Sequence, residues 1–261
     1  MACRNLQKAE DAKRSISAEV SGADLEVIEL DLSKLKSVRK FADTYQAKYD
    51  RLDILIENAG IMVPPFKKTE DGFESQMGVN YFGHFLLANL LFPLLEKTKK
   101  SRIVTLSSIA HKRARIDFDN LNAEKDYSKM SAYGQSKLAC LMFAFELHRR
   151  LSKSGKNIKA IAAHPGVAKT NIVQHIPKIL SIISAPIFSL FSHPTEQAAL
   201  PILMAALSEE VESGSYIGPT GFNEMKGKPG IVQAQPQAHD EKVSRRLWEV
   251  SEELTGEKFN V

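Results

Sequence analysis

The order of apolar runs along the chain constrains its fold most strongly. Four short runs rich in Ile, Leu, Val and Ala cover residues 25–31, 52–60, 102–108 and 158–166, and helical stretches separate them. Strands that are apolar on both faces belong to parallel sheets, in which helices form the crossover connections. No internal repeat, low-complexity stretch or linker interrupts this order. The sequence therefore predicts one doubly wound α/β domain with a mostly parallel sheet over residues 1–261.

Capping residues and helical spacing indicate the helices. Asn5 is the predicted N-cap of a first helix, in which Ala9 and Ala12 follow at helical spacing. Ser33 and Thr195 are the predicted N-caps of two later helices. The predicted helices after the first cover residues 33–49, 70–97, 132–151, 195–207 and 238–254, with a polar excursion at 109–130 and a short last strand at 215–219.

Composition excludes several classes of protein. The formal charge of +4 is spread along 261 residues, which does not favour a nucleic-acid groove. Two cysteines, Cys3 and Cys140, do not make a disulfide framework, so a reducing compartment such as the cytoplasm is expected. No apolar run reaches the roughly 18 residues of a membrane span. The closest, residues 176–192, contains Lys178 and two prolines and could line a pocket or contact a membrane surface. No metal site is predicted.

Polar or turn residues follow every predicted strand. They are Asp31, the turn Asn58-Ala59-Gly60, the pair Ser107-Ser108, and His164-Pro165-Gly166. In open α/β sheets, ligands bind beyond the carboxyl ends of the strands. The need to end a strand explains the glycine and proline residues, but it explains two adjacent serines less well.

A tyrosine and a lysine share one face of the helix at 132–151. Tyr133 and Lys137 stand four residues apart, and no other tyrosine of the six has a lysine at that spacing. A phenol is a poor acid at neutral pH, but a nearby ammonium stabilises the phenolate and makes it a usable acid or base. Alone, such a pair is more often an exposed pair on a helix surface than a catalytic pair.

Six motifs together make the chain resemble a short-chain dehydrogenase/reductase. They are DLS at 31–33, NAG at 58–60, VNYFGHF at 79–85, RIVTLSS at 102–108, YGQSK at 133–137 and HPGVAKT at 164–170. The stretch HKRARIDFDNLN and the tail LWEVSEELTG resemble the retinol-dehydrogenase-like branch, which includes the WW-domain oxidoreductase. The resemblance spans nearly the whole sequence and implies a Rossmann-like fold.

The resemblance implies four catalytic residues. Tyr133 would be the general acid/base, and Lys137 would support it and hydrogen-bond the nicotinamide ribose. Ser108 would steady the substrate oxygen, with Ser107 facing inward. Asn80 would hold a water that continues the proton path, and its alternative is a satisfied core asparagine. His164 is interpreted as structural, and the role of His111 is open.

The resemblance also implies the cofactor contacts. Asp31 would meet the adenine, and Val167 and Thr170 would contact the carboxamide end of the nicotinamide. The full predicted cofactor set is Arg4, Asp31, Leu32, Asn58, Ala59, Gly60, Tyr133, Lys137, Pro165, Gly166, Val167 and Thr170.

The start of the chain departs from the family pattern. Family members begin with a strand, a G-x-x-x-G-x-G turn, a helix and a second strand, and none of the fourteen glycines here forms that motif. Met1 to Arg4 match the end of the second strand. The expectation is an N-terminally truncated domain that lacks on the order of 30 residues, among them a strand between those at 25–31 and 52–60. Arg4 stands where NAD-preferring members place an acid, so NADP(H) is expected, with NAD less favoured.

The leading functional hypothesis is an NADP-dependent oxidoreductase that interconverts an alcohol and a carbonyl. Its substrate would be an apolar small molecule, retinoid-, steroid- or lipid-like, in a pocket formed by the apolar loop 172–192. Two alternatives stay open: an impaired member that acts as a binding protein or is inert, and a sugar-nucleotide epimerase, which the lack of a larger C-terminal domain disfavours. Substrate identity, reaction direction and oligomeric state, a homo-oligomer included, are not determined.

Overall fold

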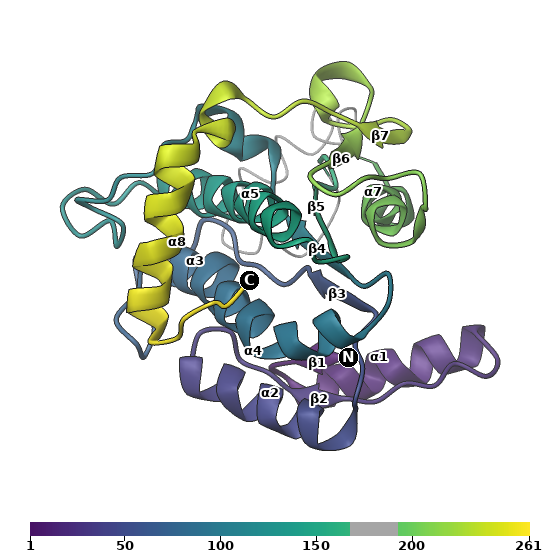
Figure 1. Ribbon diagram of the computed structural model, residues 1–261. Helices are drawn as coiled ribbons and strands as arrows, with labels where there is room; N and C mark the ends of the chain where they lie inside the picture. Colours follow the sequence, from purple (N-terminus) through teal and green to yellow (C-terminus); the bar gives the residue numbers. More distant parts are fainter. Residues whose placement is uncertain (168–192) are drawn as a thin grey trace.

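Parallel strands form the centre of the molecule, with helices on both faces (Figure 1). The computed structural model describes residues 1–167 and 193–261. Its main sheet has the order β3-β4-β5-β6-β7, in which β7 alone is antiparallel to its neighbour. The strands are β3 (Ile54–Glu57), β4 (Arg102–Leu106), β5 (Lys159–Ala163), β6 (Tyr216–Pro219) and β7 (Pro229–Ile231). The predicted α/β fold with a mostly parallel sheet is confirmed.

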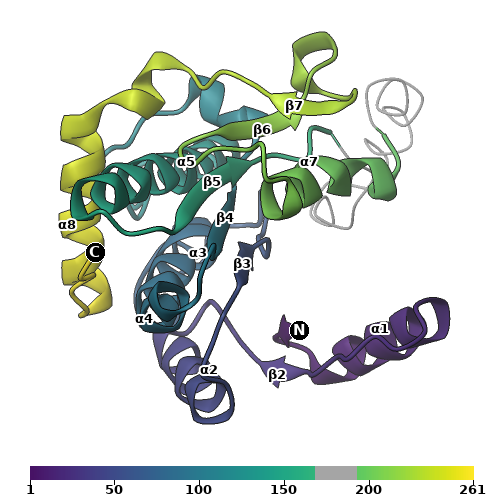
Figure 2. The same ribbon diagram turned by 45° about the vertical axis from the view of Figure 1, so that its right-hand side comes forward.

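A second, two-stranded sheet stands apart from the main one. β1 (Ala2–Cys3) pairs in parallel with β2 (Ile28–Glu29), and within the described parts of the chain no strand pairing joins this sheet to β3. The strand predicted at 25–31 is therefore shorter than expected, because its one described partner strand offers only two residues. α1 (Leu6–Glu19) connects the two strands and lies beside the main body (Figure 2). The Asn5 side chain accepts a 2.9 Å hydrogen bond from Lys8 N–H, as an N-cap should.

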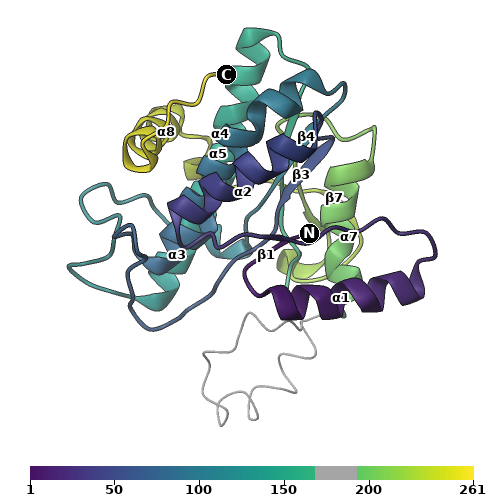
Figure 3. The same ribbon diagram turned by 90° about the horizontal axis from the view of Figure 1, so that it is seen from below.

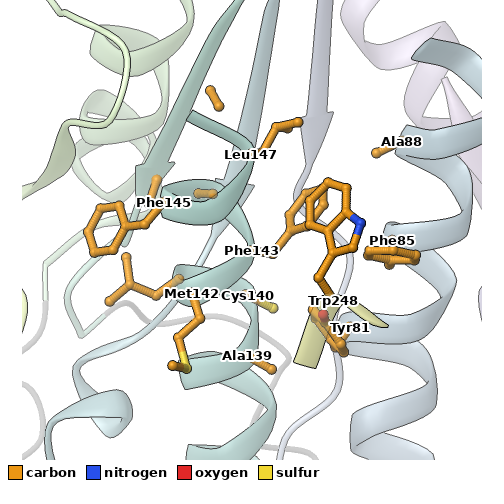
Figure 4. Close-up of a cluster of buried hydrophobic side chains, with 14 of the residues drawn as sticks. Tyr81, Phe85, Ala88, Ala139, Cys140, Met142, Phe143, Phe145, Leu147 and Trp248 are labelled. Atoms are coloured by element: carbon orange, nitrogen blue, oxygen red, sulfur yellow. The ribbon is translucent and has the colours of Figure 1, made fainter. Parts of the chain in front are cut away.

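Three long helices cover one face of the main sheet in two layers. α4 (Gly83–Lys97) and α5 (Lys129–Ser154) lie against the strands, and α8 (Glu241–Thr255) lies outside them, as Figure 3 also shows. Trp248 on α8 stacks on Phe143 with ring centroids 5.7 Å apart and meets Phe85 edge-on at 5.3 Å (Figure 4). These aromatic contacts bury the outer face of α4 and α5.

α7 (Thr195–Leu207) covers the opposite face, where its alanines pack on β4, β5 and β6. The residue that caps α7 is Pro194, whose extended backbone leads into the first helical residue. The prediction that Thr195 is the cap is therefore wrong by one position.

The single helix predicted at 70–97 is divided into three pieces. These are α3 (Ser75–Met77), a π-helix (Gly78–Phe82) and α4. Gly72 adopts a φ of 88° in the turn before them, and the Glu74 carboxylate caps α3 by accepting bonds from two backbone N–H groups. Residues 75–97 together are long and apolar enough to cross a membrane, but 78% of the apolar window is buried inside the protein, as in a core helix.

α2 (Leu35–Lys48) packs against α4 and begins later than expected. Ser33 does not cap it, because the Ser33 hydroxyl donates to Asp31 Oδ1 at 2.7 Å. Instead, Leu35 N–H donates to Asp71 Oδ2 at 2.9 Å, so the cap comes from a distant loop.

Candidate active site

α5 brings Tyr133 and Lys137 against the carboxyl end of β4. Both side chains are buried, with 6% and 4% of their surface exposed. Lys137 Nζ donates to the carbonyl of Leu106, the last residue of β4, at 2.9 Å. Ser107 Oγ donates in turn to the Lys137 carbonyl at 2.8 Å. The catalytic helix is thus fixed to the strand end from both sides.

Asn80 joins the loop after β3 to α5. Its amide nitrogen donates to the Ile61 carbonyl at 3.0 Å and to Ser136 Oγ at 2.9 Å, and its oxygen accepts from Ile61 N–H at 2.8 Å. The side chain is therefore satisfied by protein groups, as in the alternative interpretation. Its role in holding a water stays a prediction.

Gly60 lies where Asn80 and Lys137 meet. A Cβ atom on Gly60 would stand 3.2 Å from Asn80 Oδ1 and 3.5 Å from Lys137 Nζ. Glycine therefore keeps this position free of a side chain that would crowd Asn80 and the buried ammonium. A ligand beyond the strand ends can approach such a backbone closely, so these residues fit the predicted nicotinamide site.

Ser108 is the more accessible serine of the pair that follows β4. It is half-buried, whereas Ser107 is buried and directed at α5. Ser108 Oγ accepts from Ala110 N–H at 3.3 Å and caps the 3₁₀ helix at Ile109–Arg113. A hydroxyl in this position can also reach a substrate oxygen.

His111 holds the turn that carries Ser108. Its Nδ1 donates to the Ser108 carbonyl at 2.7 Å, and its Nε2 accepts from Gln235 N–H at 3.5 Å. Burial lowers the pKa of His111, so the ring is neutral at pH 7. The open role of this histidine is thus one of support: it ties the serine turn to the C-terminal segment.

His164 lies in a buried polar cluster away from Lys137. Its Nε2 stands 3.2 Å from Glu224 Oε2, and Lys112 Nζ donates to the other carboxylate oxygen at 2.8 Å. Burial raises the pKa of Glu224, but hydrogen bonds from His164 and Lys112 outweigh it and set the value at about 2. Burial lowers the pKa of His164, so the charged pair at neutral pH is Lys112 with Glu224. This arrangement favours the structural interpretation of His164.

Glu57 is a buried carboxyl group that the sequence reasoning missed. It is 2% exposed at the end of β3, and Thr105 Oγ1 donates to its Oε2 at 2.8 Å. Burial raises its pKa to about 8, although Thr105 and the Lys137 charge lower it. An acid inside an apolar strand run, one residue before Asn58, was the signal available in the sequence.

The predicted cofactor residues lie at the ends of four strands. Arg4 is exposed after β1, Asp31 follows β2, and Asn58, Ala59 and Gly60 follow β3. Leu32, Pro165, Gly166 and Val167 are further described members at strand ends, whereas Tyr133 and Lys137 lie on α5. β1 and β2 are parallel neighbours, so their ends bring Arg4 and Asp31 to one edge. Thr170 and the loop at 176–192 lie outside the described residues.

Two of these residues serve local structure. Asp31 Oδ1 accepts from the backbone and hydroxyl of Ser33 at 3.0 and 2.7 Å. Leu32 is buried next to Gly83, where an added Cβ would stand 3.1 Å from the Leu32 Cβ. The contact of Asp31 with the adenine and the cofactor contact of Leu32 stay predictions.

Comparison with known proteins decides the family. A model of the family "short chain dehydrogenase" matches residues 1–179. The chain belongs to the short-chain dehydrogenase family. This dehydrogenase is 44% identical to human retinol dehydrogenase 13 over 263 residues, which are 98% of the chain and 76% of that protein. The predicted resemblance to the retinol-dehydrogenase-like branch is confirmed, and with it an NAD(P)-dependent oxidoreductase that acts on CH–OH groups.

Solved structures agree with this assignment. The crystal structure of an uncharacterised protein from Mycobacterium paratuberculosis superposes with a TM-score of 0.80 at 39% identity, over 100% of this chain and 85% of the other. The Pseudomonas aeruginosa RhlG/NADP active-site complex superposes with a TM-score of 0.61 at 26% identity, over 82% of each chain. The dehydrogenase therefore shares both its fold and part of its sequence with solved proteins.

A cleft of about 1010 Å³ adjoins the site. The segment after Ser108 forms one wall, and Ser131, Gly134 and Gln135 of α5 form another. None of the four predicted catalytic residues of this dehydrogenase lines the cleft. In residues 1–167 and 193–261, no group of three or more His, Cys, Asp or Glu side chains could hold a metal ion.

Proposed function

We propose that this short-chain dehydrogenase interconverts an alcohol and a carbonyl group on an apolar small molecule, with NADP(H) as the hydride carrier. One observation carries the proposal: Lys137, Asn80 and Gly60 converge at the carboxyl ends of β3 and β4. Tyr133 lies one helical turn before Lys137 on the same buried face. No observation on the described residues favours a binding protein or an epimerase.

The protein's own groups divide the work of the reaction. The bound nicotinamide supplies or accepts the hydride. Tyr133 gives a proton to the carbonyl oxygen or takes one from the alcohol, and the buried Lys137 ammonium stabilises the phenolate. Ser108 hydrogen-bonds the same substrate oxygen. Burial excludes water from this region, which strengthens each of these interactions.

The preference for NADP(H) rests on Arg4. Its side chain is exposed at the end of β1, and in the part of the chain that the structure describes it forms no ion pair. A guanidinium forms charge-assisted, bidentate hydrogen bonds with a phosphate group. The similar RhlG structure is a complex with NADP, which supports the same choice for this chain.

Four further proposals concern the substrate class, the compartment, the oligomer and the membrane. The apolar substrate class is supported by the apolar loop at 172–192 and by the similarity to human retinol dehydrogenases 13 and 14. The cytoplasm is the proposed compartment, because Cys3 and Cys140 are both free thiols. A homo-oligomer and a peripheral membrane contact through residues 176–192 remain proposals of the same kind.

The test of the function is Tyr133→Phe, with retinaldehyde and NADPH as the probe pair. The loss of acid catalysis should lower kcat by about 10²–10⁴-fold. NADPH binding, followed by its fluorescence, should change little. Tyr49→Phe is the matched control, because Tyr49 is an exposed residue at the C-terminal end of α2 and its loss should leave full activity. Residual activity of Tyr133→Phe above about a tenth of the parent would contradict the assignment.

Arg4→Asp tests the cofactor preference. A charge-assisted hydrogen bond contributes about 1.5–3 kcal/mol, so the ratio of kcat/KM for NADPH to that for NADH should fall at least about tenfold. The comparison needs both cofactors with the parent and the variant. An unchanged ratio would show that other residues recognise the 2′-phosphate.

A further inference from the structure

Gln76 is a fully buried amide that the proposed mechanism does not use. It lies in α3, four residues before Asn80, and none of its surface is exposed. Its oxygen accepts from Val63 N–H at 2.9 Å, and its nitrogen donates to the Lys129 carbonyl at 3.1 Å. The same nitrogen lies 3.3 Å from the hydroxyl of Tyr127. One side chain thus joins the loop after β3 to the beginning of α5.

Asn80 makes the same connection one turn later. It bonds Ile61 on the loop and Ser136 on α5. Ile61 and Val63 are two residues apart on the loop, while Lys129 and Ser136 are about two helical turns apart on α5. The two amides therefore form parallel bridges between the same pair of elements. Asn80 itself belongs to the π-helix at 78–82, and such helices often occur at functional sites.

The loop that Gln76 holds is strained. Val63 has a φ of 50°, which is unfavourable for a β-branched side chain. Its N–H is bonded to Gln76, and the next carbonyl, that of Pro64, accepts from Tyr127 at 2.8 Å. A strained backbone persists only where surrounding contacts determine it. Here these contacts come from Gln76 and from Tyr127, whose hydroxyl accepts from the Gln76 amide.

We propose that Gln76 is a positioning residue of the active site, which fixes the loop at 58–66 relative to the start of the catalytic helix. Gly60 stands at one end of the fixed segment, and Tyr133 follows Lys129 by one turn. Loss of the Gln76 bridge leaves Asn80 as the single amide between the two elements. The distance from Gly60 to the Tyr133 hydroxyl is then less well defined, and a misplacement of about 1 Å can cost up to a hundredfold in rate.

Hydrogen exchange on the full 261-residue chain tests the bridge without any activity. Gln76→Leu should raise exchange at least about fivefold in peptides 58–66 and 127–133 together, because Val63 N–H loses its acceptor and the beginning of α5 loses the donor that holds the Lys129 carbonyl. Peptides of α8 should not change. Gln135→Leu is the matched control: Gln135 is another buried amide, and it bonds Asp117 N–H and the Leu121 carbonyl instead. In this control, hydrogen exchange of peptide 58–66 should be the same as in the parent protein.

Gln76→Glu separates the two ends of the bridge and is the milder variant. The ionised carboxylate still accepts from Val63 N–H but cannot donate to the Lys129 carbonyl, so exchange is measured at a pH high enough to ionise this buried group. Exchange should therefore rise in peptide 127–133 and stay low in peptide 58–66. Equal protection of both peptides in Gln76→Leu and the parent, or loss of protection at 58–66 in Gln135→Leu as well, would overturn the proposal.

The kinetic arm rests on the proposed function. Gln76→Leu should lower kcat by between about tenfold and a hundredfold, with a smaller change in KM. When Val63→Gly is added to Gln76→Leu, kcat should rise again by about fivefold. Glycine adopts a positive φ without strain and so keeps the loop conformation. A general loss of stability would not be rescued in this way. If the parent shows no turnover with retinaldehyde and NADPH, the proposed function fails, and the exchange measurements still decide the role of Gln76.

Discussion

At the scale of the residue, Glu57 shows how burial changes chemistry next to the site. Its carboxyl group lies between β3 and β4, and one of its oxygens accepts a hydrogen bond from Thr105. Its pKa is raised to about 8 by burial, against 4.5 for the free side chain, although the positive charge of Lys137 lowers it. The native state therefore holds this proton at neutral pH, while the unfolded chain has lost it. Folding at neutral pH takes up a proton at this site.

Glu57 should make stability depend on pH in a defined direction. Because the native state binds the proton more tightly, the free energy of unfolding should fall as the pH rises from about 4.5 through about 8, and level off above. The loss can reach at most about 5 kcal/mol, and Glu57→Gln should remove this slope. Urea unfolding of both proteins at several pH values measures it, with Glu29→Gln, an exposed glutamate of β2, as control. Equal pH slopes for the parent and Glu57→Gln would show that Glu57 does not hold the proton.

The sequence predicted a candidate site residue where the spacing of residues along the chain was itself the signal. Tyr133 and Lys137 share a helix face because of their spacing, and the structure buries both. Gln76 and Glu57 carried no comparable pattern, because their importance comes from contacts between segments far apart in the sequence. A single buried amide or carboxyl group acquires its role only when the tertiary structure surrounds it.

At the scale of the element, the ends of helices depend on distant residues. The predicted N-cap of α2 was Ser33, but the Ser33 hydroxyl donates a hydrogen bond to Asp31 instead. Asp71 supplies the acceptor for Leu35 N–H from a loop that follows β3, next to an ion pair between Lys34 and Glu70. The local sequence therefore predicted the position of the helix but not the residue that caps it. The division of residues 75–97 by a π-helix was equally hidden, because the apolar pattern continues through it.

Asp71→Ala should destabilise the protein by about 1 kcal/mol, because a helix N-terminal N–H loses its acceptor. Asp71→Asn should keep most of the stability, since an amide oxygen caps nearly as well. Thermal or urea unfolding of the three proteins measures the difference. Equal stability of Asp71→Ala and the parent would mean that water replaces the carboxylate at no cost.

At the scale of the whole molecule, packing is uneven between the two sheets. The alternation of strands and helices predicted the parallel core, and α8 completes it through Trp248. β7 was not predicted, because a three-residue strand that begins with proline carries little pattern. α1 buries only Ala9, and the sheet of β1 and β2 consists of two residue pairs. The prediction of a further strand between β2 and β3 stays untested.

This unevenness predicts which part of the protein opens first. Local opening follows buried contacts and hydrogen bonds, so α1 should open at a much lower free energy than the core. Trypsin under native conditions should therefore cut first at Lys8, Lys13 or Arg14, which mass spectrometry of the early fragments would identify. Arg245 and Arg246 on α8 are the internal control, since they are equally exposed but stand on a helix that packs on the core through Trp248. Early cleavage at α8, or simultaneous cleavage at both helices, would show that the two sheets unfold as one cooperative unit.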